Sequence, residues 1–210
     1  FLCEKQQAMT EIMSFTTREV RWLLEQPVPE AGHWFEALPK NAYTRESREV
    51  VYLGLPGRAD LGLKFRENRL ELKYRCGNSE MAEVAPGMVG VFESWEKLGF
   101  PTTPEIVNSV LPQTSHASRI PVIKRRRATL METFGEVTFN PLGIPVTAGI
   151  QLEYTELQVL GRSWYTLGLE WPGEKGIAFP AGFISNLQGA VILQADMSMG
   201  YPEFLQRAGN

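Results

Sequence analysis

The sequence predicts an α+β protein that is mainly β, folded as an antiparallel barrel or as two facing sheets. About eight segments alternate apolar and polar residues with the period of two that half-buried strands show. Few segments have helical spacing, and no apolar run is long enough to span a membrane. Strands that follow one another along a chain with few helices between them are typical of antiparallel sheets.

Composition indicates an ordinary globular protein with a local site. The chain has 210 residues, of which 43% are hydrophobic and 21% charged, enough for one domain or two small ones. A net charge of −3 and a pI near 5.6 argue against a protein that coats nucleic acid. The two cysteines, Cys3 and Cys76, suit a reducing compartment, so we expect a cytoplasmic location. Residues 1–14 lack a signal-peptide core and are interpreted as an N-terminal extension.

The first elements follow directly from alternation and proline positions. Residues 15–24 predict a strand with Glu19 and Arg21 on its polar face. Residues 31–38 have helical spacing and predict a short helix that ends before a proline. Residues 43–55 contain a β-branched run and predict the second strand.

The stretch LGLKFRENRLELKYR, residues 61–75, predicts an antiparallel hairpin with a break at residues 67–69. One face of the hairpin is apolar. The other face carries the cations Lys64, Arg66, Lys73 and Arg75. Like charges on neighbouring strands repel, so this face needs open water, interleaved carboxylates or an anionic ligand.

The middle of the chain is less periodic. Residues 89–98 have apolar side chains at spacings of three and four, which predicts a strand followed by a helix. Residues 101–118 are rich in Pro, Thr and Ser and predict a connection with a short helix around residues 105–111.

A second basic strand is predicted over residues 119–131, RIPVIKRRRATLM. Lys124 and Arg126 fall on one of its faces, and Arg125 and Arg127 on the other. Alternation alone does not say which pair faces inward. Further strands are predicted within residues 132–140, 148–160 and 164–171, followed by an outer amphipathic helix over residues 184–195 and a helical turn over residues 199–206.

The polar faces of these strands collect charges of both signs. The cations are Arg21, Lys64, Arg66, Lys73, Arg75, Lys124 and Arg126, and the carboxylates are Glu19, Glu71, Glu153 and Glu170. Such a face is often simply the solvated side of a sheet. Here the cations come from four segments, whereas a solvated surface more often intersperses the two signs. This segregation favours a site for polyphosphate, because Arg and Lys bind phosphate oxygens and carboxylates hold Mg²⁺ or Mn²⁺.

Several motifs together resemble the CYTH-like superfamily, also called triphosphate tunnel metalloenzymes. They are the acidic strand near the N-terminus, the basic hairpin with LELK, the K-x-R of residues 124–126, and the late QLEYTE and WYTLGLE pair. The resemblance implies one domain over residues 15–210, built as a closed eight-stranded antiparallel tunnel with a charged interior and a few helices outside. Members include inorganic, thiamine and RNA 5′-triphosphatases and some adenylate cyclases.

The resemblance also implies roles for individual residues. Catalysis and the binding of Mg²⁺ or Mn²⁺ would fall to Glu19, Glu153 and Glu170. Substrate would be bound by Arg21, Lys64, Arg66, Lys73, Arg75, Lys124 and Arg126. The chain departs from the family motif at Thr17, where a first glutamate is expected, and at Thr155, where a second late carboxylate is expected. A hydroxyl is a poor substitute for a carboxylate ligand, so metal binding should be weaker.

Three hypotheses follow. The chain hydrolyses a triphosphate with a divalent metal, or binds a phosphorylated anion without cleaving it, or is a protein-interaction domain with a solvated charged sheet. For the first two, the expected partner is tripolyphosphate or a nucleoside or thiamine triphosphate. Neither a membrane nor nucleic acid is expected as a partner.

Overall fold

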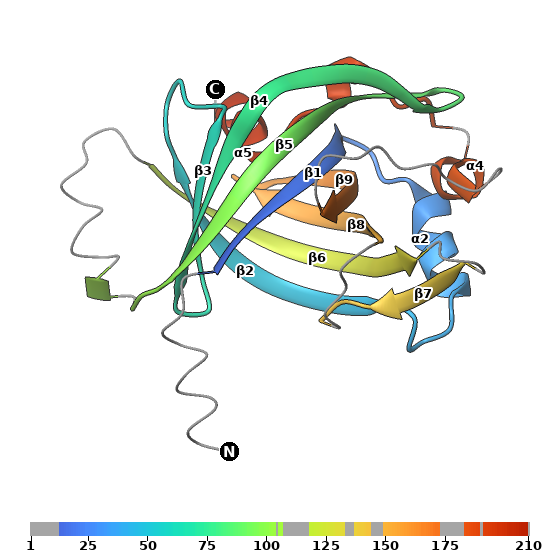
Figure 1. Ribbon diagram of the computed structural model, residues 1–210, viewed down its shortest axis with the longest axis horizontal. Coiled ribbons are helices and arrows are strands. Elements are labelled where there is room, and N and C mark those ends of the chain that lie inside the picture. The colour runs from blue at the N-terminus through green and yellow to red at the C-terminus, as the bar shows by residue number, and fades with distance from the viewer. Residues whose placement is uncertain are drawn as a thin grey trace.

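The computed structural model describes residues 13–103, 105–106, 118–132, 137–143, 149–172, 183–189 and 191–209. These residues form a sheet of nine antiparallel strands (Figure 1). The strands are β1 (Met13–Leu24), β2 (Thr44–Gly54), β3 (Leu61–Arg66), β4 (Arg69–Ala85), β5 (Met88–Pro101), β6 (Ser118–Glu132), β7 (Thr138–Pro141), β8 (Ile150–Val159) and β9 (Arg162–Pro172).

Eight of the strands close into a barrel. Their order is β2-β3-β4-β5-β1-β9-β8-β6, and a pairing between β2 and β6 joins the two ends of the sheet. β6 pairs with β2 from Ser118 to Ala128, and β7 pairs with the end of β6 beyond this point. The predicted mainly β fold, an eight-stranded antiparallel barrel with a charged interior, is therefore confirmed.

Two helices cover the outside of the barrel. Helix α2 (Pro29–Ala37) and helix α4 (Phe183–Gln188) lie beside each other at one end of the molecule (Figure 1). Trp34 of α2 makes an edge contact with Phe183 at a centroid distance of 5.5 Å. Outward-facing side chains of β1, β8 and β9 pack beneath α2 and form the larger hydrophobic core. No helix among the described residues is long and apolar enough to cross a membrane.

Helix α5 (Tyr201–Ala208) follows a short 3₁₀ turn (Ala195–Met197) and packs against the inside of the strands. Its side chains Tyr201, Phe204 and Leu205 belong to a second core with Val50 and Val122. These two valines alternate along β2 and β6 with side chains that line the charged cavity described below, so they face inward. The interior thus has an apolar end, filled by α5, and a charged remainder.

The prediction of a helix within residues 89–98 is wrong, because β5 is one continuous strand paired with β4 and β1. Trp95 on its inner face is fully buried, and Phe92 on its outer face packs on Trp171 at 5.8 Å. Both faces of the strand carry large apolar side chains. Their combined spacing imitates a helix although the backbone is extended.

The predicted helix over residues 184–195 is shorter in the structure. Gly189 adopts a positive φ of 62° directly after α4, a conformation that terminates helices. Leu193 then forms backbone hydrogen bonds with Gly87 and Val89. Of the predicted connection and helix at residues 101–118, residues 104 and 107–117 lie outside the described residues, as do residues 1–12, 133–136 and 144–148.

Candidate anion-binding site

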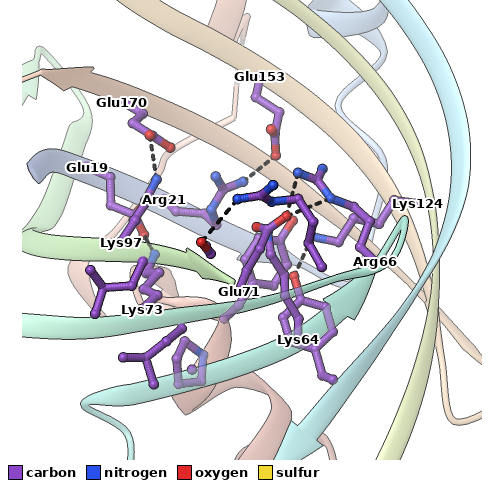
Figure 2. Close-up of a pocket in the computed structure, with 18 of the residues that line it drawn as sticks. Glu19, Arg21, Lys64, Arg66, Glu71, Lys73, Lys97, Lys124, Glu153 and Glu170 are labelled. Carbon is purple, nitrogen blue, oxygen red and sulfur yellow. Dashed lines mark hydrogen bonds and ion pairs between the residues drawn. The ribbon is translucent and has the colours of Figure 1, made fainter. Parts of the chain in front are cut away.

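The charged face of the sheet lines a cavity of about 360 Å³ inside the barrel, within the roughly 300–1,000 Å³ typical of small-molecule sites. The cations of the lining are Arg21, Arg48, Lys64, Arg66, Arg69, Lys73, Lys97, Lys124 and Arg126. The carboxylates of the lining are Glu19, Glu71, Glu153 and Glu170. Figure 2 shows many of these side chains converging on one space from several strands.

Every residue predicted for the site except Arg75 lies on this cavity wall. Arg75 follows Lys73 on the same face of β4, and its guanidinium lies 2.5 Å from the buried carboxylate of Glu93. Arg75 is therefore an interior cation that neutralises Glu93 next to the cavity.

The register of β6 decides which of its cations face the cavity. Lys124 and Arg126 point inward, opposite Leu157 and Thr155 of β8, respectively. Arg125 points outward and pairs with Glu156 at 2.7 Å. Alternation along β6 therefore gives the cavity two of the four consecutive cations.

Glu19 of β1 is almost fully buried and bound by lysines. The Nζ of Lys73 lies 2.5 Å from one of its oxygens, and the Nζ of Lys97 lies 3.9 Å from the other. Burial would raise the pKa of Glu19, but Lys73, Lys97 and Arg21 lower it to about 2. Glu19 is therefore a carboxylate at any physiological pH.

Glu153 of β8 joins two arginines. Its oxygens lie 2.7 Å from Arg21 and 3.0 Å from Arg126. Burial opposes ionisation, yet the two guanidinium groups hold the pKa of Glu153 well below its usual range. Gly168 on β9 makes room for this arrangement, because a Cβ there would lie 2.8 Å from the Arg21 guanidinium.

Glu71 connects two cations of the basic hairpin. Lys64 and Arg66 approach its oxygens at 2.7 and 2.6 Å. Burial and the nearby charge of Arg66 outweigh the attraction of Glu71 and lower the pKa of Lys64 to about 8. One carboxylate thus compensates only part of the positive charge on this strand pair.

Lys124 is the most deeply placed amine of the cavity. Its Nζ donates to the Tyr52 hydroxyl at 2.7 Å and lies 3.6 Å from the centre of the Tyr201 ring. No ion pair among the described residues includes Lys124. Burial, followed by the charge of Lys64, lowers the pKa of Lys124 well below its usual value.

Lys97 of β5 lies between two carboxylates that face each other across β1 and β9. Glu19 and Glu170 are directly opposite in the register of these strands. The Nζ of Lys97 lies 2.5 Å from Glu170 and 3.9 Å from Glu19. Burial would lower the pKa of Lys97, but the two carboxylates raise it.

Sequence reasoning missed three cations of the lining, Arg48, Arg69 and Lys97. Arg48 alternates with Glu46 and Val50 along β2, so continued alternation through that strand would have found it. Lys97 lies in the part of residues 89–98 where the apolar spacing predicts a helix, so strand alternation does not place it on a polar face. Arg69 lies at the start of β4, where the sequence predicts the hairpin break.

The carboxylates predicted to hold Mg²⁺ or Mn²⁺ do not fit a divalent cation in this arrangement. Glu19, Glu153 and Glu170 each form an ion pair with a lysine or arginine at 2.5 to 2.7 Å. A divalent ion binds carboxylate oxygens that are free to coordinate it. At least one oxygen of each carboxylate already contacts an ammonium or guanidinium group.

The other possible metal ligands among the described residues do not form a divalent-metal site either. Across the part of the chain that the structure describes, no three His, Cys, Asp or Glu side chains are grouped so that they could hold a metal ion. Thr17 and Thr155 are buried and offer hydroxyls where the resemblance would place carboxylates.

No protein-family model and no curated protein matches the sequence. Among solved structures, the chain is similar to the S. pombe Pct1 RNA triphosphatase in complex with the Spt5 CTD, at 9% sequence identity and a TM-score of 0.34. The match covers 76% of this chain and 70% of the other. At this level of similarity the comparison carries no conclusion about activity.

Proposed function

We propose that the barrel binds a chain of phosphates in its cavity, either tripolyphosphate or the triphosphate of an organic molecule such as a nucleotide or thiamine. One observation carries the proposal: nine cationic side chains line the cavity against four carboxylates. Lysine and arginine are the residues that form strong charge-assisted hydrogen bonds to phosphate oxygens.

The electrostatics of the cavity support an anionic ligand. Burial and neighbouring cations lower the pKa values of Lys64 and Lys124, which means that the positive charges there are unfavourable without compensation. A polyphosphate would supply several negative charges in a compact chain. Binding would therefore relieve repulsion as well as form new hydrogen bonds.

The resemblance also implies metal-dependent hydrolysis at Glu19, Glu153 and Glu170. The ion pairs of these carboxylates favour binding over hydrolysis. No metal-dependent step follows from their geometry. Measuring phosphate release in EDTA and in Mg²⁺ or Mn²⁺ tests whether a bound phosphate chain is cleaved.

The first test is calorimetric titration with tripolyphosphate, ATP and thiamine triphosphate, each in EDTA and in Mg²⁺ or Mn²⁺. Phosphate release is measured in the same mixtures. We expect saturable binding in EDTA that weakens as salt is added, because ionic contacts are screened. EDTA-sensitive phosphate release would establish the hydrolase, and absence of binding to all three ligands would overturn the proposal.

Two neighbouring arginines of β6 give a matched pair of variants. Arg126→Ala removes a cation from the cavity, and Arg125→Ala removes one from the outer surface. We expect Arg126→Ala to lower tripolyphosphate affinity by about 10-fold or more, the effect of losing a charge-assisted hydrogen bond. Arg125→Ala should bind like the wild type. Equal losses in both variants would mean that the ligand is attracted by overall charge and not by the cavity.

A further inference from the structure

The side of the cavity formed by β1, β9 and β5 holds an arrangement that the resemblance does not explain. Glu19 and Glu170 lie directly opposite each other on adjacent strands and both line the cavity. Two carboxylates in this position repel each other unless a cation lies near both. In an oxygen-rich site, a divalent metal ion commonly fills this role.

In this chain the cation is part of the protein. Lys97 reaches this position from β5, and its Nζ lies 2.5 Å from Glu170 and 3.9 Å from Glu19 (Figure 2). Lys73 holds the other oxygen of Glu19 at 2.5 Å. The carboxylate pair is therefore compensated by ammonium groups before any ligand binds.

We propose that the ammonium group of Lys97 takes the place of a divalent metal ion between Glu19 and Glu170, so that the cavity binds its phosphate ligand without a metal. This inference rests on the proposed function for the identity of the ligand. Lys97 is a positioning residue as well as a cation of the cavity, because it holds Glu170 at 2.5 Å and lies 3.9 Å from Glu19. The positive charge of Lys97 offsets the negative charges of Glu19 and Glu170, so these carboxylates repel a bound anion less.

The inference makes a prediction that is specific to this lysine. If Lys97 is changed to methionine, the carboxylate pair loses the cation between its members and becomes open to a divalent ion. The matched control is Lys64→Met. It removes another cavity lysine, but its carboxylate partner, Glu71, is still held by Arg66 at 2.6 Å. Glu170, in contrast, has no other ion pair among the described residues once Lys97 is gone.

The experiment tests whether a metal ion rescues tripolyphosphate binding. Calorimetry measures the affinity of the wild type and of each variant in EDTA and in Mn²⁺. Each variant is compared with the wild type in the same solution, because Mn²⁺ also complexes tripolyphosphate itself, and the wild type should bind in both solutions. Each variant should lose about tenfold in EDTA, the effect of one charge-assisted contact. Mn²⁺ should restore affinity to Lys97→Met and leave Lys64→Met unrescued. Wild-type binding that disappears in EDTA would overturn the inference and leave the proposed function standing, and equal rescue of both variants would also overturn it.

A second measurement, without phosphate, separates the inference from the proposed function. Mn²⁺ alone is titrated into wild type, Lys97→Met and Lys97→Gln, and bound ion is counted from the loss of the free Mn²⁺ electron-spin-resonance signal. Binding by the variants and not by the wild type supports the inference even if no phosphate ligand binds. Mn²⁺ binding by the wild type at the same affinity as the variants would refute it.

Discussion

Lys64 and Lys124 illustrate at the scale of single residues how a crowded cationic cavity changes side-chain chemistry. Both are amines that would be charged in water, and burial is the first cause of their lowered pKa values. Lys64 retains a carboxylate partner, Glu71, whereas Lys124 is held by the Tyr52 hydroxyl and the Tyr201 ring. An anion entering the cavity would favour the protonated form of both.

Polyphosphate binding should therefore take up protons. The pKa of Lys64 is about 8 in the free protein, so above this pH much of its amine is neutral, and a bound anion would raise the pKa. Affinity should fall as pH rises through about 8. Calorimetry in buffers of different ionisation enthalpy should show proton uptake near this pH.

The control for proton uptake is a pair of variants. Lys64→Met should reduce the uptake near pH 8, and Arg125→Ala on the outer surface should leave it unchanged. Binding without proton uptake in the wild type would contradict the assignment of Lys64 as a partly neutral amine near pH 8.

Strand β5 shows, at the scale of elements, where sequence reasoning succeeds and where it fails. Alternation identifies β1, β3, β8 and β9 because each has one clearly polar face, whereas β2 is predicted from its β-branched run. In β5 the inner face carries both Trp95 and Lys97, and the outer face carries Phe92. Because apolar side chains lie on both faces, the sequence of β5 does not alternate with a period of two. Alternation therefore does not assign Lys97 to a polar strand face.

Helix α5 illustrates a different limit. Its short sequence predicts only a helical turn, and nothing in that turn says that it enters the barrel. The position follows from the strands around it, since Phe204 and Leu205 pack on inward-facing residues of β2, β6 and β8. Long-range packing of this kind is not encoded in local periodicity.

Removing a large buried side chain of α5 should destabilise the whole barrel. Phe204 is 3% exposed, and its ring makes an edge contact with Trp164 at 5.2 Å. Phe204→Ala should lower the free energy of unfolding by about 3–5 kcal/mol. Arg207→Ala on the exposed side of the same helix should cost about 0.5 kcal/mol or less. Urea unfolding measures both, and similar values would mean that α5 is not part of the cooperative core.

At the scale of the whole molecule, the cavity lining and the chain as a whole carry charge of opposite sign. The chain as a whole carries a net charge of −3, yet the cavity lining is rich in cations. Sequence patterns placed most of these cations on common strand faces. They did not decide between inside and outside, because that choice depends on the pairing of β2 with β6, which closes the barrel.

The same closed interior should make the fold sensitive to acid. Glu19 has a pKa of about 2 in the folded protein against 4.5 as its ordinary value. A lowered carboxyl pKa stabilises the fold above the ordinary value, and this stability is lost as pH falls toward the folded value. For Glu19 the loss should reach about 3 kcal/mol between pH 4.5 and pH 2, and Glu153 should add to it.

Urea unfolding at a series of pH values, for wild type and Glu19→Gln, isolates this contribution. The comparison is needed because other carboxyl groups act differently; burial raises the pKa of Glu93, for example, which opposes the trend. The variant should be less stable than the wild type at neutral pH, since Lys73 and Lys97 lose a charged partner. The difference between the two proteins should shrink as pH falls below 4.5, because the wild-type carboxylate becomes protonated. A difference that stays constant down to the acid transition would show that Glu19 is not held as a buried carboxylate by the cavity lysines.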